Sequence, residues 1–117
     1  MPGVGYDTLF DSDGDNTNQQ IKASGGRLFG MEISNPNSVD AYLQLFDAAS
    51  ADITVGTTTP KQSYLIPAGD GTLDGAFDIT FTPDWMHFHT AIFYACTTTA
   101  TGNGDPSTGL VCNFWFI

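Results

Sequence analysis

Three carboxylates at alternate positions are the first residues whose type and spacing suggest cation binding. Asp11, Asp13 and Asp15 have the spacing that opens a helix–loop–helix calcium loop. That loop needs Gly at its sixth position and a bidentate Glu at its twelfth, where this chain has Asn16 and Lys22. Because Lys22 removes two ligand oxygens and adds a cation, we expect a solvated acidic turn whose side chains cap the backbone. A looser carboxylate site is the alternative.

A pair of imidazoles is the second candidate for metal binding. On one strand, His87 and His89 would share a face with their Cβ atoms roughly 7 Å apart, close enough for one metal ion. No third ligand is evident, since Asp84 falls in a turn before the strand, although symmetric copies around a trimer axis could complete a site. We favour polar residues on a partly buried sheet face near an interface, and we expect neither a metal nor a cofactor.

The two cysteines could form a disulfide or stay as thiols. Cys96 and Cys112 flank the predicted loop 99–108, and a hairpin centred near Gly104 would place them roughly opposite each other. Residues 1–7 contain no positive region and no apolar stretch, so we expect no secretory signal peptide and synthesis in a reducing cytosol. We therefore favour two free thiols over a bridge.

Motifs of nucleophilic catalysis and phosphate binding are missing from the sequence. There is no Gly-x-Ser-x-Gly elbow, phosphate loop, dinucleotide fingerprint or zinc-ligand pair of cysteines. Composition alone does not exclude an unrecognised triad, but 117 residues leave no room for a lid or second domain that would form a cleft. We expect a protein without enzyme activity.

The charge of the chain excludes several classes of partner. Thirteen acidic residues outnumber three basic ones, which gives a formal net charge of −10. Phosphates of nucleic acids and anionic headgroups would repel such a chain, so we expect no nucleic-acid partner and no membrane partner. Hydrophobic residues make up 41% of the chain, enough for a core, but no apolar run approaches the roughly 20 residues of a membrane span.

The elements that would position these residues are short strands. Turn-forming residues recur every eight to twelve positions, which is typical of a sandwich or barrel. Alternation supports several strands: Phe77, Ile79 and Phe81, for example, share one face. At most one helical turn is expected, around residues 47–51. The predicted strands are 6–10, 19–23, 27–34, 41–47, 53–55, 62–66, 76–81, 86–97 and 109–117. The sequence therefore predicts one all-β domain over residues 1–117, a single antiparallel β-sandwich, jelly-roll-like, with about eight strands.

The last two predicted strands are apolar on both faces. In residues 109–117, Phe114 and Phe116 point one way while Trp115 and Ile117 point the other. In residues 86–97, Met86, Phe88, Ile92 and Tyr94 share one face. The opposite face carries Ala91 and Phe93, together with Trp85 just before the strand. One core cannot absorb both faces, so either a neighbouring subunit or a capping loop, such as the N-terminal segment, must cover the second. We favour a subunit. The candidate interface residues are Trp85, Phe93, Trp115 and Ile117.

From residue 21 to residue 102, the chain contains a series of short segments whose order and spacing resemble those of a known family. IKASGGRLFG (21–30) and ISNPNS (33–38) lead into AYLQLFDA (41–48). The series ends with GTTTP (56–60), an Ile-Pro turn (66–67) and ACTTTATG (95–102), before a final apolar strand. In order and spacing, residues 19–117 resemble small β-sandwich virion proteins of tailed bacteriophages. Residues 1–18 lie outside this resemblance and could form an acidic arm or strand.

The resemblance implies a non-enzymatic structural protein, plausibly a capsid decoration (cement) protein on the outer surface of the virion. Its partners would be the major capsid protein and further copies of itself, as a homotrimer at three-fold positions, after synthesis in the host cytoplasm. A receptor- or glycan-binding module of a phage fibre or tail is the alternative, since similar sandwiches occur there. A third interpretation, a secreted cellular adhesion domain, is disfavoured by the expected lack of a signal peptide.

Overall fold

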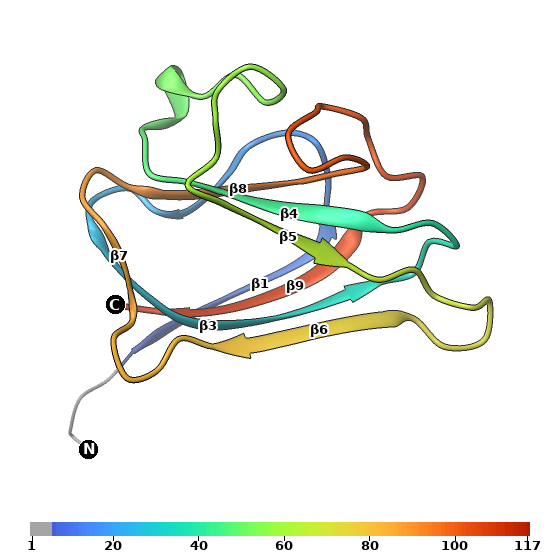
Figure 1. Ribbon diagram of the computed structural model, residues 1–117. Coiled ribbons are helices and arrows are strands. Elements are labelled where there is room, and N and C mark those ends of the chain that lie inside the picture. The colour runs from blue at the N-terminus through green and yellow to red at the C-terminus, as the bar shows by residue number, and fades with distance from the viewer. Residues whose placement is uncertain (1–5) are drawn as a thin grey trace.

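Short strands of the computed structural model pair into two antiparallel sheets that face each other (Figure 1). The structure describes residues 6–117. Sheet A has the strand order β1-β9-β3-β6, with β7 also paired to β3, and sheet B has the order β2-β8-β4-β5. The strands are β1 (Asp7–Gly14), β2 (Gln19–Lys22), β3 (Gly26–Asn35), β4 (Ala41–Phe46), β5 (Gln62–Ile66), β6 (Gly75–Thr80), β7 (Met86–Phe88), β8 (Ile92–Thr97) and β9 (Leu110–Phe116).

The strand order is that of a jelly roll. When the three-residue β7 is set aside, eight strands remain, four in each sheet, and the chain passes between the sheets in the double Greek-key pattern. Every pairing is antiparallel. The predicted fold class, an antiparallel β-sandwich of jelly-roll type, is therefore confirmed. The described helical structure is one 3-10 turn, η1 (Ser50–Asp52), which overlaps residues 47–51, where a single helical turn is expected.

The core lies between the two sheets and follows from alternation along the strands. In β9, Phe114 and Phe116 are buried in this core, whereas Trp115 between them is half-buried and faces outward. Tyr94 of β8 reaches the core from the opposite sheet, and its ring centroid lies 4.6 Å from that of Phe114. Its hydroxyl donates a hydrogen bond to the Asp11 carboxylate. Burial, together with this bond, raises the pKa of Tyr94 far above its ordinary value, so the phenol stays protonated.

The long strand predicted over residues 86–97 is wrong, because the chain changes sheet in its middle. β7 pairs with β3 in sheet A, and β8 pairs with β2 and β4 in sheet B. At the crossing, the backbone N–H groups of His89 and Thr90 donate to the carboxylate of Asp47, at 2.9 and 2.8 Å. These two N–H groups are therefore satisfied by a side chain instead of a neighbouring strand.

Most other strand boundaries differ from the prediction by one residue, and two differences are larger. Residues 53–55 form no strand: Ile53 follows η1, and Val55 begins a turn. β1 continues to Gly14 beyond the predicted end at Phe10, with an irregular register between Asp11 and Gly14, and the turn is confined to residues 15–18. Of the two predictions for residues 1–18, an arm or a strand, the described part therefore contains a strand of sheet A. Residues 1–5 lie outside the described part.

Candidate interaction surface

The outer face of sheet B is covered by the chain itself. The connection between β4 and β5, residues 47–61, folds over it and places Ile53 and Val55 against Phe46 and Phe93. Phe93 is only 6% exposed as a result. Figure 1 shows this connection and the β8–β9 connection together above sheet B, at the top of the view. The second apolar face of β8 is thus accounted for within one chain, by a capping loop other than the N-terminal segment.

The β8–β9 connection, residues 98–109, covers the remainder of this face. Gln44 on the outer side of β4 is fully buried, and its Nε2 donates to Thr97 Oγ1 at 2.7 Å and to the Gly102 carbonyl at 3.0 Å. The two connections also touch, because a Cβ at Gly56 would lie 2.9 Å from the Cβ of Asn103. Together they cover the outer side of the central strands β8 and β4, while Leu65 of the edge strand β5 remains 45% exposed.

Asp47 fastens the first of these connections to the β7–β8 crossing. Partial burial by itself would raise the pKa of its carboxyl. The backbone N–H donors of His89, Thr90 and Ala91, with a smaller contribution from Lys61, outweigh that effect and hold the pKa below its usual value. The charged form of Asp47 is therefore the one that the fold stabilises.

The outer face of sheet A carries aromatic side chains and no such cover. Within residues 6–117, no long connection crosses this face, and only Trp85, from the short segment between β6 and β7, packs on it. We call five residues of this face the outer aromatic patch: Tyr6, Phe10, Phe29, Trp85 and Trp115. Tyr6 is 54% exposed and Phe10 is 64% exposed, while the other three are half-buried. The patch is an apolar surface open to solvent.

The rings of the patch contact one another. The centroids of Phe29 and Trp85 lie 4.2 Å apart with the planes tilted by 55°, and Tyr6 meets Phe29 edge-on at 5.6 Å. The guanidinium carbon of Arg27 lies 5.7 Å from the centre of the Trp85 ring, within the range of a cation–π contact. Such contacts hold the rings in a defined arrangement before any partner binds.

A β-bulge in β3 places Phe29 on this surface. The register of β3 against β9 shifts between Leu28 and Gly30, so that Phe29 is the extra residue. Leu28 and Met31 both point into the core, three positions apart, because the bulge changes the phase of the alternation. Gly30 is required here, since a Cβ at this position would lie 2.7 Å from the carbonyl oxygen of Ile79.

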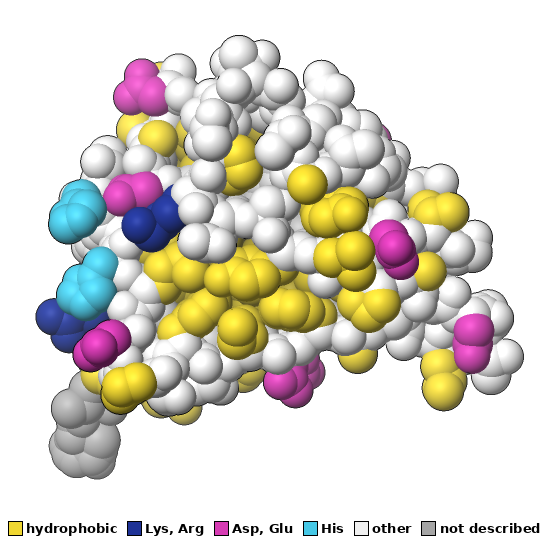
Figure 2. All heavy atoms as spheres, in the orientation of Figure 1, with side chains coloured by type: hydrophobic (Ala, Val, Ile, Leu, Met, Phe, Trp, Pro, Cys, Tyr) yellow, Lys and Arg dark blue, Asp and Glu magenta, His cyan; other side chains and the backbone are white. Residues whose placement is uncertain are grey.

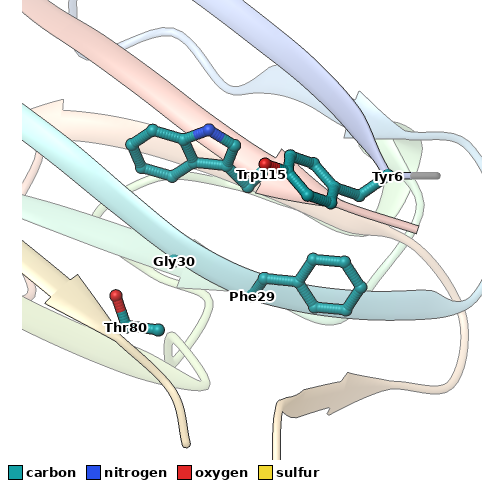
Figure 3. A pocket seen from close by; sticks show the side chains of 5 residues that line it. All are labelled: Tyr6, Phe29, Gly30, Thr80 and Trp115. Atoms are coloured by element: carbon teal, nitrogen blue, oxygen red, sulfur yellow. The ribbon is translucent and has the colours of Figure 1, made fainter. Parts of the chain in front are cut away.

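Trp115 separates two shallow hollows on the patch. The larger hollow, of about 410 Å³, is lined by residues of β3, β6 and β9 and by the residue that precedes β1. The side chains that line it lie on one side of the sheet (Figure 3). They are Tyr6, Phe29, Gly30, Thr80 and Trp115. The smaller, of about 240 Å³, lies between β1 and β9 and is bordered by Phe10 and Asn113 among others. Both hollows are lined by neutral groups, which suits apolar contact better than acid–base chemistry.

Three of the four predicted interface residues come together on this side of the molecule. Trp85 and Trp115 belong to the outer aromatic patch. Ile117, two positions after Trp115, is 41% exposed and exchanges two backbone hydrogen bonds with Arg27, of 2.9 and 3.0 Å. Phe93 lies apart from them, on the outer face of the other sheet and beneath its own chain. A single interface that includes all four is therefore inconsistent with the fold.

The sequence analysis missed Tyr6, Phe10 and Phe29 as members of this surface. Alternation along the first strand could have identified Tyr6 and Phe10, because it places them on one face together with Thr8, which pairs with Trp115. The signal for Phe29 is the glycine that follows it, since a glycine inside a strand often marks a bulge. These three aromatic residues complete the patch.

A second apolar area lies at the open side of the sandwich, between the edge strands β5 and β6. Figure 2 shows it as a continuous yellow surface. The ring of Tyr64 in β5 lies 5.4 Å from that of Phe77 and 6.2 Å from that of Phe81, so these residues bridge the two sheets. Partial burial raises the pKa of Tyr64. Because these side chains pack against the central core, we assign this area to the fold.

The residues considered for metal binding have other contacts. Asp11 accepts hydrogen bonds from the Asp13 N–H and the Tyr94 hydroxyl, and Asp15 accepts one from the Thr17 N–H. His87 and His89 are both exposed and flank the buried Phe88. Because β7 ends at Phe88, His89 lies outside the strand, and the two imidazoles are not aligned on one strand face. Within the described part of the chain, no three His, Cys, Asp or Glu side chains are grouped to hold a metal ion.

Across residues 6–117 there is no helix with the length and apolar character needed to cross a membrane. The outer aromatic patch consists of aromatic rings with the guanidinium group of Arg27 beside them, and both residue types are enriched at protein–protein interfaces. The chain matches no protein-family model, no curated protein and no solved structure.

Proposed function

We propose that the chain is a non-enzymatic structural protein of a bacteriophage virion, of the capsid decoration type. In this role it attaches to the outer surface of the capsid and clamps neighbouring copies of the major capsid protein. The order of segments over residues 19–117 supports the proposal, as does a jelly-roll sandwich, the kind of fold that the resemblance implies. Because one fold hosts many functions, the surface of the protein has to indicate the role.

The observation that carries the proposal is the outer aromatic patch, which no connection within residues 6–117 covers. A large apolar surface on a small soluble domain marks a site of interaction, and aromatic residues with an adjacent arginine are enriched at the centres of interfaces. Trp115 lies at the middle of the patch, between the two hollows, where a partner side chain would be most desolvated. We assign the patch to contacts between copies of the chain in a homotrimer.

Attachment as a trimer would strengthen a modest affinity for the capsid. Three linked copies bind three equivalent sites with an effective concentration far above that of free chains. The net charge of −10 would keep the protein soluble before assembly and away from packaged DNA. Both properties suit a component that is added to the outside of a filled head.

Mass spectrometry of purified virions tests this proposal. A copy number of the same order as that of the major capsid protein is expected for a decoration protein. A copy number that is a small fraction of it would place the chain in a fibre or tail instead, and absence from the virion would overturn the proposal.

A glycan-binding module of a fibre is the second candidate, and the larger hollow favours it. The hollow presents the rings of Tyr6, Phe29 and Trp115 beside the hydroxyl of Thr80, a mixture of apolar surface and few polar groups that suits a small ligand. Titration of the protein with soluble oligosaccharides, followed by tryptophan fluorescence, separates the two. A hollow buried between subunits would give no saturable change, whereas an open sugar site would give one that Trp115→Ala removes.

A further inference from the structure

Two cysteine thiols meet in the core from opposite sheets. Cys96 belongs to β8 of sheet B and Cys112 to β9 of sheet A, so the predicted hairpin between these strands is wrong. Their Sγ atoms nevertheless lie only 3.8 Å apart, and both side chains are fully buried and unbridged. The pair is therefore a contact across the sandwich between residues sixteen positions apart.

The end of β1 forms a thin cover over the two sulfur atoms. A Cβ at Gly14 would lie 2.8 Å from Cys96 Sγ and 2.9 Å from Cys112 Sγ, so only a glycine leaves room for them. The next residue, Asp15, accepts a hydrogen bond of 2.7 Å from the Cys96 N–H. β1 is an edge strand whose register is irregular between Asp11 and Gly14. The end of β1 is thus a segment of an edge strand that lies directly against both thiols.

We propose that Cys96 and Cys112 are a site of reversible disulfide formation, in which the folded chain reacts with a low-molecular-weight disulfide such as oxidised glutathione. A disulfide bond is about 2.05 Å long, so the sulfur atoms must approach by less than about 2 Å. The two thiols already touch, so a small relative movement of the two side chains and their strands would close the bond. The inference does not depend on the proposed virion function.

The reaction balances as two successive thiol–disulfide exchanges. One cysteine thiolate attacks the oxidant, the bond between the oxidant's sulfur atoms breaks, and one glutathione thiolate leaves. The second cysteine thiolate attacks the resulting mixed disulfide and releases the second glutathione. The two protons of the cysteine thiols pass through solvent to the two leaving thiolates, so the chain is oxidised by two electrons and the oxidant is reduced to two thiols.

The first exchange requires the end of β1 to open, because the folded core has no space for glutathione. The contact with Cys112 and burial raise the pKa of the Cys96 thiol, which also keeps the closed form slow to react. Edge strands open locally at lower free energy than the core. The product would link sheet A to sheet B and restrict the unfolded chain, which raises thermal stability.

The test is oxidation of the reduced, folded wild-type protein with glutathione disulfide, followed by intact mass and by titration of thiols in denaturant. The expected result is a mass lower by two hydrogens, joint loss of both thiols, and a single-chain species on a non-reducing gel. The oxidised protein should keep its native circular dichroism and unfold at a higher temperature, and dithiothreitol should restore the original midpoint.

Single serine variants provide the matched controls. Cys96→Ser and Cys112→Ser each retain one thiol and should accumulate a glutathione adduct at most, with no rise in the thermal midpoint. In the wild-type protein, thiols that persist, a stable glutathione adduct, or cross-linked dimers would each overturn the inference. Loss of the native spectrum on oxidation would overturn it as well. These wild-type outcomes decide the question even if a serine variant fails to fold.

Discussion

The two sheets of this sandwich have apolar outer faces, but within residues 6–117 only the face of sheet B is covered by connections of its own chain. On sheet B, Phe93 lies beneath Ile53 and Val55 of the β4–β5 connection. On sheet A, Trp115 lies between two open hollows, and Phe10 beside it is 64% exposed. A strand that is apolar on both faces therefore needs a cover, but the sequence of the strand does not say whether that cover comes from the same chain or from another.

The lengths of the connections explain the difference. Residues 47–61 and 98–109 are the two longest described connections, and each begins at the end of a sheet B strand. The connections at the edges of sheet A are shorter, and the one over residues 81–85 contributes only Trp85 to the outer face. Among residues 6–117, no connection therefore covers the apolar face of sheet A, which the proposed assembly would bury.

Introducing a charge at the centre of the outer aromatic patch should have the largest effect. Trp115→Asp would bury an unpaired carboxylate between subunits and should weaken association by about 3–5 kcal/mol. Light scattering should find a dissociated protein whose circular dichroism still reports β-structure. Ala76→Asp is the matched control, because Ala76 is exposed on β6, the edge strand of the same sheet, outside the patch.

The opposite outcome for this variant is equally informative. If Trp115→Asp unfolds the isolated chain, Trp115 contributes to the core of one subunit, and the patch loses its central residue. An association that survives the substitution would place the contact between copies elsewhere on the molecule.

Truncating the covered aromatic residue should affect folding instead of association. Phe93→Ala removes a ring that is buried within one chain and should lower the free energy of unfolding by about 3 kcal/mol. Phe10→Ala, at an exposed position of the patch, should change it by less than about 0.5 kcal/mol. Urea denaturation of dilute protein measures both, and equal losses would contradict the contrast between the two faces.

Alternation along single strands was enough to predict the fold class and the faces of the last strand. Phe114 and Phe116 are in the core and Trp115 faces outward, as the pattern indicates, because side-chain direction in a strand is a local property. Here the sequence was sufficient, since neighbouring residues decide the outcome. Alternation did not place Trp85 correctly: it put Trp85 on one face with Phe93, but the two residues belong to different sides of the sandwich because the chain changes sheet between them.

Contacts between distant segments could not be predicted in this way. The break at His89 depends on a carboxylate 42 positions away, Asp47, and the burial of Phe93 depends on Ile53. The meeting of Cys96 and Cys112 depends on their being in different sheets, which no strand pattern reveals. Each of these features requires the topology before it can be derived.

Removing the charge of Asp47, whose carboxylate holds the β4–β5 connection to the β7–β8 crossing, should have a smaller effect on stability. Asp47→Asn replaces one acceptor oxygen with a donor and should lower the free energy of unfolding by about 1 kcal/mol at neutral pH. The pKa of Asp47 is lower in the folded chain, so its contribution is complete above the ordinary value of 3.8. It is lost as the pH falls through the folded value.

Thermal unfolding of wild type and Asp47→Asn at a series of pH values measures this dependence. The two midpoints should differ at neutral pH and converge below about pH 4. Asp52→Asn, at an exposed position of the same connection, is the control and should follow the wild type throughout. A difference between wild type and Asp47→Asn that persists at low pH would exclude the charge of Asp47 as its cause.

The mass of the wild-type protein in solution tests the central claim most directly, that the outer aromatic patch is an interface between copies of this chain. Static light scattering at high micromolar concentration should give three times the chain mass of 12.5 kDa. A mass that stays at 12.5 kDa over this concentration range would contradict the claim.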